Sequence, residues 1–135
     1  MGVRGSVLAM AMALFFVGCS ERGSGATLEQ RAGKYWELKQ TKRWEEVYDS
    51  YLDPALKSAL SRDAFLKKRL LAFNILKYTI TEAREDGDQG TVRVSGEANI
   101  PARGVRGAVR MMQTEITVED KWIRRGGVWY VQLAE

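Results

Sequence analysis

The chain contains no histidine and only one cysteine among its 135 residues. Histidine is the side chain used most often for acid–base chemistry near neutral pH and for binding zinc, so its absence excludes the commonest catalytic base. A single cysteine excludes an internal disulfide and a cysteine-based zinc site. We therefore expect no metal centre and no cofactor.

An excess of charge of one sign is also missing. The formal net charge is +4, with 21 basic and 17 acidic side chains. A nucleic-acid binder needs a clustered basic surface, so we expect no nucleic-acid partner, and at most a mild attraction to an anionic membrane. Two prolines and 45% hydrophobic residues are typical of a folded protein, and the length predicts one domain.

The single cysteine follows an apolar run near the N-terminus. Arg4 precedes eleven apolar residues at positions 7–17, and the small residue Gly18 comes directly before Cys19. These are the parts of a secretory signal peptide, and the run is too short to span a bilayer. An ordinary signal peptide with an incidental cysteine, or a buried structural thiol, is the alternative interpretation.

The order Phe16-Val17-Gly18-Cys19 resembles the lipobox of bacterial lipoproteins, with phenylalanine where leucine is commoner. The resemblance implies a cleaved signal peptide at 1–18, an acylated Cys19 with a flexible tether at 19–26, and one domain at 27–135. Several acyl chains would anchor the protein stably. Ser20 is not the aspartate that retains enteric lipoproteins in the inner membrane, so we expect the outer membrane, facing the periplasm. A Gram-positive host would place the protein on the outer face of the cytoplasmic membrane.

Apolar residues recur with helical spacing in the first half of the domain. One predicted helix has a stripe formed by Leu28, Ala32, Tyr35, Trp36 and Lys39, and the next has a stripe formed by Trp44, Val47, Tyr48, Tyr51 and Leu52. Asp53 is expected to cap a short helix that opens with Pro54, and Ser61 to cap a fourth helix. In that helix we expect inward Phe65, Leu66, Leu70 and Phe73, and outward Lys67, Lys68 and Arg69.

After Asn74 the apolar period changes from 3.6 to two, which predicts strands. The expected inward residues are Tyr78, Ile80, Val92, Val94, Ala98 and Ile100, then Met112, Ile116, Val118 and Trp122, then Trp129, Val131 and Leu133. Glycine-containing turns lie at 86–90 and 124–127. The predicted fold class is α+β, with N-terminal helices packed on a curved antiparallel β-sheet.

The stretches "YWELKQTKRWEEVYDSYLDP" and "VEDKWIRRGGVWYVQL", in this order, resemble the nuclear transport factor 2-like (NTF2-like) superfamily, also called the cystatin-like or cone fold. The resemblance covers nearly all of residues 27–135 and rests on architectural residues. It implies a conical cavity that is an active site in some members and binds a ligand or a protein in others. Fold alone does not decide between these functions.

Two carboxylates are the candidates for a catalytic base. Asp120 is expected to share a face with Val118 and Trp122, and Glu82 to share one with Tyr78 and Ile80. Desolvation there would raise the pKa of either carboxylate. The alternative is that both are solvated near strand ends, or that one of them pairs with Arg84.

The expected pocket of the cone is formed by Tyr35, Tyr78, Thr114 and Asp120. Thr114 is expected to satisfy a local hydrogen bond rather than to bind a substrate. The leading hypothesis is a lipid-anchored, non-enzymatic cell-envelope protein that binds a small ligand or an envelope protein. The alternatives are a small periplasmic lyase or isomerase that uses Asp120 or Glu82, and an envelope assembly factor working through an exposed sheet face. A second copy of the chain, paired through the sheet, is a further candidate partner.

Overall fold

The computed structural model describes residues 25–69 and 73–133. The predicted signal peptide and Cys19 lie outside the described residues, so the lipoprotein assignment stays a prediction. Leu70, expected to face inward, also lies outside them. Within the described part, no helix is long and apolar enough to cross a membrane.

Five helical segments precede the sheet in the described chain. They are α1 (Leu28–Gln40), α2 (Trp44–Glu46), the π-helical η1 (Val47–Tyr51), α3 (Pro54–Lys57) and α4 (Arg62–Arg69). The Thr27 side chain accepts a hydrogen bond from the Gln30 backbone, and the Gln30 side chain accepts one from the Thr27 backbone. This capping box sets the start of α1.

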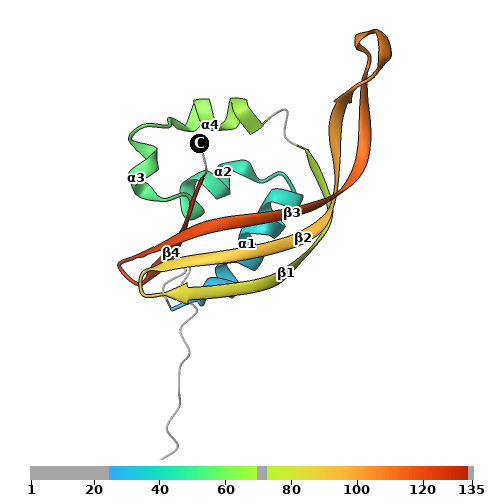
Figure 1. The fold of residues 1–135 in the computed structure, drawn as a ribbon. Coiled ribbons are helices and arrows are strands. Elements are labelled where there is room, and N and C mark those ends of the chain that lie inside the picture. The colour runs from blue at the N-terminus through green and yellow to red at the C-terminus, as the bar shows by residue number, and fades with distance from the viewer. Residues whose placement is uncertain (1–24, 70–72, 134–135) are drawn as a thin grey trace, which may run out of the picture.

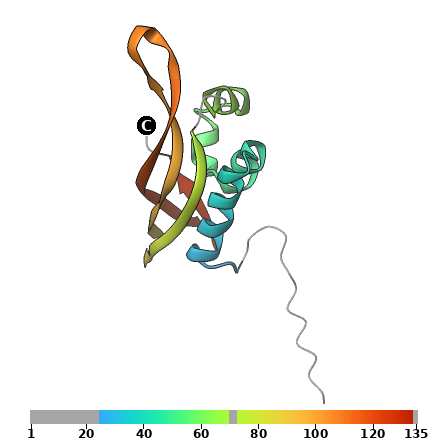
Figure 2. The same ribbon diagram turned by 90° about the vertical axis from the view of Figure 1, so that its right-hand side faces the viewer.

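Four strands follow in an antiparallel meander, with the spatial order β1-β2-β3-β4. They are β1 (Asn74–Asp86), β2 (Gln89–Arg103), β3 (Val109–Arg125) and β4 (Val128–Gln132), and the short 3-10 turn η2 (Val105–Gly107) joins β2 to β3. The sheet curves, and the helices lie against its concave face (Figures 1 and 2). The predicted α+β class is confirmed.

The core lies between α1 and the sheet, and its α1 side is the predicted stripe. Leu28, Ala32, Tyr35, Trp36 and Lys39 are all buried. The sheet contributes mainly Val92, Val94, Trp122, Trp129 and Val131. Aromatic rings fill much of this space, since Tyr35 packs edge-on against Trp122 with 5.4 Å between ring centroids.

The second predicted helix forms, but it changes from α-helical in α2 to π-helical in η1. The Leu52 N–H donates to the Val47 carbonyl at 3.0 Å, five residues back, which is the π-helical pattern. Val47, Tyr48, Tyr51 and Leu52 are buried as expected, whereas Trp44 is only partly buried.

Asp53 ties the helices to the sheet. Its carboxylate caps α3 through the Ala55 N–H at 3.1 Å, as the sequence predicts, and accepts hydrogen bonds from Arg125 Nε at 2.9 Å and Gln132 Nε2 at 3.3 Å. Its own N–H donates to the Val131 carbonyl at 3.0 Å. Burial alone would raise the pKa of Asp53, but these hydrogen bonds outweigh it and the pKa is lowered.

β1 contains two bulges opposite the regular strand β2. The pairing register shifts between Ile75 and Lys77 and again between Ile80 and Glu82. Beside the first bulge, a Cβ atom on Gly96 would lie 2.2 Å from the Lys77 carbonyl oxygen, so this position requires glycine. Bulges increase the bend and twist of a strand, which fits the curvature of this sheet.

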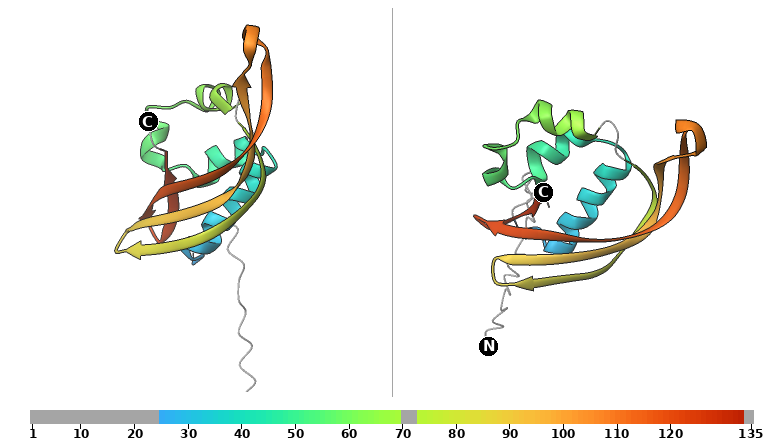
Figure 3. Two further views of the ribbon diagram at one scale, coloured as in Figure 1. Left: turned by 45° about the vertical axis from the view of Figure 1, so that its right-hand side comes forward. Right: turned by 45° about the horizontal axis from the view of Figure 1, so that its top comes forward.

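The β2–β3 hairpin is longer than the rest of the sheet. Pairing with β1 ends at Asn99 and pairing with β4 ends at Lys121, so residues 100–112, called the arm below, form a two-stranded ribbon and its turn. The arm projects beyond the helices (Figures 1 and 3). The prediction that Met112 is buried is therefore wrong: the residue is 54% exposed because none of the described helices covers this end of β3.

Replacing Asp53 with alanine is expected to lower the free energy of unfolding of the full chain by about 2 kcal/mol, because a helix cap and charge-assisted hydrogen bonds are lost together. Asp49→Ala is the control: Asp49 is exposed and pairs only with exposed Arg62, so the change should be below about 1 kcal/mol. Urea unfolding at pH 7 measures both, and equal losses would contradict the role of Asp53.

The comparison of the natural chain with Asp53→Ala also predicts how the stabilisation by Asp53 depends on pH. The folded-state pKa of Asp53 lies below its unfolded value, so its stabilisation is present above the unfolded pKa of about 3.9 and is lost as the pH falls through the folded pKa. The stability difference between the natural chain and Asp53→Ala should therefore shrink in urea titrations below about pH 4. A constant difference would show that the carboxylate is not the source of the stabilisation.

Candidate functional site

Trp36 on α1 is the centre of an interior cluster. Its indole N–H donates to Asp120 Oδ2 on β3 at 2.8 Å. Its ring lies 5.9 Å from the Tyr78 ring of β1 and 6.4 Å from that of Tyr35. One side chain of α1 therefore connects two strands of the sheet.

Lys39 places a cation on this cluster. Its Nζ lies 3.7 Å from the centroid of the Trp36 ring and 4.9 Å from that of Tyr35, and the residue is buried. Burial lowers the pKa of Lys39 to about 8, an effect that Asp120 opposes and Arg69 reinforces. The ammonium group therefore exchanges its proton within reach of physiological pH.

Asp120 is held in the same environment. Burial raises the pKa of this carboxyl, while the charge of Lys39 and the Trp36 hydrogen bond reduce the rise. Burial and the charge of Asp120 also raise the pKa of the Tyr35 hydroxyl, which stays protonated. A carboxylate, an amine and a phenol could exchange protons here, but one carboxylate oxygen is already held by the indole of Trp36.

Three of the four expected pocket residues meet at this cluster, namely Tyr35, Tyr78 and Asp120. The fourth does not: Thr114 is six residues from Asp120 along the extended strand β3, or about 20 Å. Its hydroxyl donates to the Glu115 carbonyl at 3.4 Å, which is a local hydrogen bond of the expected kind.

Glu82 does not share the inner face with Tyr78 and Ile80, and this prediction is wrong. The bulge at Thr81 shifts the alternation by one residue, so Glu82 lies opposite the exposed Arg93. Its carboxylate pairs with Arg84 at 3.0 Å and with Arg93 at 3.5 Å on the outer face. A partly exposed, doubly paired carboxylate is a poor general base.

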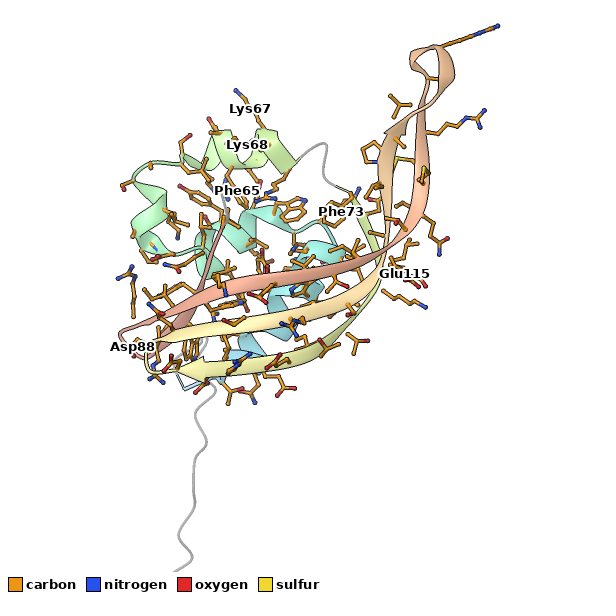
Figure 4. All side chains as sticks on the ribbon, viewed as in Figure 1. Phe65, Lys67, Lys68, Phe73, Asp88 and Glu115 are labelled. Atoms are coloured by element: carbon orange, nitrogen blue, oxygen red, sulfur yellow. The ribbon has the colours of Figure 1, made fainter. Side chains whose placement is uncertain are left out.

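A hollow of about 320 Å³, called the α3–α4 hollow below, lies beside α3, α4 and the segment after β4. Its lining is mostly apolar, with two cations and no acidic residue: Leu56, Ala59, Leu60, Phe65, Lys68, Arg69 and Leu133. Phe65 lies on the inner side of α4, whereas Lys67 projects from the outer side (Figure 4). Asp120 does not line this hollow.

Arg69, which lines the α3–α4 hollow, stacks on two aromatic rings. Its guanidinium lies over the Phe65 ring at 5.0 Å and the Trp44 ring at 5.5 Å. The Nε atom is buried and has no hydrogen-bond acceptor among residues 25–69 and 73–133. The prediction that Arg69 points outward is wrong, because its side chain folds back over these two rings.

Two contributors to the site are not among the residues that the sequence predicts. Lys39 stood in the apolar stripe of α1, and a lysine at a buried helical position is the signal that could have identified it. Arg69 carried no such signal, since it ends a run of basic residues. The described residues contain no cluster of acidic, cysteine or histidine side chains that could hold a metal ion.

Comparisons with known proteins find similar folds and no matching family. No protein-family model and no curated protein matches the chain. The structure is similar to that of a SEC-C motif containing protein from Rhodopseudomonas palustris, with a TM-score of 0.51 and 17% identity over 84% of this chain and 79% of the other. It is also similar to the intermembrane space region of the chloroplast protein ARC6, with a TM-score of 0.51 and 14% identity over 78% of this chain and 89% of that one.

The interior cluster predicts the titration of one lysine. In the full chain carrying ¹³Cε-labelled lysine, the Lys39 signal is expected to titrate near pH 8 by nuclear magnetic resonance. Asp120→Asn removes the opposing negative charge, so the pKa of Lys39 should fall further. The signal that disappears in Lys39→Met is that of Lys39. A Lys39 pKa near 10.4, or a Lys39 pKa that Asp120→Asn leaves unchanged, would contradict the cluster geometry.

Proposed function

We propose that this chain is a lipid-anchored, non-enzymatic binding protein of the bacterial cell envelope, with an NTF2-like cone domain that takes a small amphipathic anion. The curved sheet and its helical cover support the cone assignment. The lipobox-like stretch ending at Cys19 supports the anchor, with outer-membrane attachment and a periplasmic domain. The alternative is that the same domain binds a partner protein instead of a small ligand.

The observation that carries the binding proposal is the lining of the α3–α4 hollow. Small-ligand pockets are mostly apolar, hold about 300 Å³ or more, and use a few polar groups to orient the ligand. This hollow has apolar walls of that size and two cationic side chains, Lys68 and Arg69. The Lys68 ammonium and the Arg69 guanidinium would pair with a carboxylate or phosphate group, and the apolar part of the ligand would contact Leu60 and Phe65.

A lyase or isomerase that uses Asp120 is the second candidate, because burial raises the pKa of Asp120 beside Tyr35 and Lys39. The binding function is favoured for two reasons. The indole N–H of Trp36 already donates a hydrogen bond to the Asp120 carboxylate, and the other predicted base, Glu82, is ion-paired on the outer face. Catalytic turnover by the purified protein that disappears in Asp120→Asn would establish the enzyme instead.

The anchor has a direct test. Cys19→Ala is expected to remove the acylation site and to shift the protein from the membrane fraction to the soluble fraction of the cell envelope. Ser20→Ala, next to it, is the control and should stay in the membrane fraction. Unchanged membrane retention of Cys19→Ala would contradict lipid anchoring at this residue.

The ligand class is tested with decanoate as the probe, by native mass spectrometry of the full-length protein. One bound decanoate is expected, and decyltrimethylammonium, which has the opposite charge, is expected not to bind. Lys68→Glu should weaken decanoate binding by about fivefold, since it reverses a charge at the hollow. Lys67→Glu makes the same change on the outer side of α4 and should have no effect.

Equal binding of both amphiphiles, or equal losses in the two lysine variants, would contradict an anion site in the α3–α4 hollow. Co-release of the natural protein with a second protein, and without any small molecule, would favour the partner-binding alternative.

A further inference from the structure

The arm has an apolar surface on both of its faces. Val109 is 67% exposed and Met111 is 53% exposed on the outer face, and Met112 is 54% exposed on the inner face. Opposite them on β2, Pro101 pairs with Met111 and Ile100 pairs with Met112. A two-stranded ribbon in water gains stability by burying one face, so apolar residues on both faces need another explanation.

All the charged residues of the arm are basic. Residues 98–114 contain three arginines, at positions 103, 106 and 110, and no acidic residue. Arg106 and Arg110 are exposed, and Arg106 lies in the turn with a positive φ of 70°. The acidic residues closest in sequence, Glu97 and Glu115, flank this segment at the edge of the main sheet.

We propose that the arm inserts shallowly into an anionic phospholipid surface. Apolar side chains on both faces favour a surrounding apolar medium over a flat protein surface, which would cover only one face. Arg106 and Arg110 are exposed and can pair with headgroup phosphates, and this attraction strengthens binding about fivefold for each arginine near an anionic surface. The insertion stays at the interface, because the outer edges of the arm carry backbone groups that pair with no other described strand and need water or headgroups.

The arm and the start of α1 lie at opposite ends of the domain (Figures 1 and 2). A bilayer contact at the arm is therefore a separate contact from the anchor proposed at Cys19, and the inference holds whether or not Cys19 is acylated. It is equally independent of the α3–α4 hollow, whose lining residues are in other elements.

Photo-crosslinking in vesicles tests the proposal. The full-length protein, with benzoylphenylalanine in place of Val109, is mixed with vesicles of phosphatidylcholine alone or with phosphatidylglycerol added, and lipid adducts are counted by mass spectrometry. Adducts are expected to rise severalfold with phosphatidylglycerol. The same probe at Thr117, an exposed position on the same face of β3 over the body of the domain, is expected to give few adducts in either vesicle.

The charge dependence is tested in the same assay with Arg106→Glu and Arg110→Glu combined, which should lower the adducts at position 109 severalfold, to about the level found with phosphatidylcholine alone. Both residues are exposed, so the fold should survive the substitution. Adducts that are equal at 109 and 117, that ignore phosphatidylglycerol, or that survive the double variant would overturn the proposal. A crosslink to a second copy of the chain would overturn it as well and would assign the arm to a dimer interface.

Discussion

The difference in length between α1 and the strands is the constraint that shapes this molecule. A helix of 13 residues is about 20 Å long, whereas the 17 residues of β3 extend over about 56 Å. One helix cannot cover such a sheet. The strands therefore bend around α1, with bulges in β1 and a required glycine at position 96, and the part that reaches beyond the helices is the arm.

Two cations are buried between α1 and the elements packed against it. Arg31 and Lys39 are two turns apart on α1 and both are buried. Arg31 donates to the Trp129 carbonyl at 3.0 Å and lies 3.9 Å over the Tyr51 ring, and Lys39 lies over Trp36. Each cation ends on an aromatic ring rather than in a cavity. Polar atoms thus set how α1 lies on the sheet, while aromatic rings supply the contact area.

Most of the fold could be predicted from the sequence because its signals are local. The stripe of α1, the cap at Asp53 and the alternation in β2 each follow from spacing alone. The bulge at Thr81 could not be predicted, since an inserted residue leaves the composition of a strand unchanged while it reverses the faces after it. Glu82 was misplaced for that reason.

The exposed arm and the folded-back Arg69 could not be predicted for a different reason. Both depend on which element lies opposite, which is a tertiary property. Met112 continues the inward alternation of β3 without a helix to face it, and Arg69 finds the rings of Phe65 and Trp44 at the end of α4. For the site, Tyr35, Tyr78 and Asp120 were within reach of sequence reasoning, because each continues the period of its own element.

The meander order of the strands has a consequence for chain connectivity. The helices α1 to α4 and η1, together with β1 and β2, precede the turn of the arm at η2, and β3 and β4 follow it. The pairing from Gln89↔Ile123 to Asn99↔Gln113 does not involve the arm. A protease that cuts after an arginine of the exposed turn would thus divide the polypeptide into two fragments that remain joined by a complete β-ladder, and new termini or an inserted domain should be tolerated at the same place.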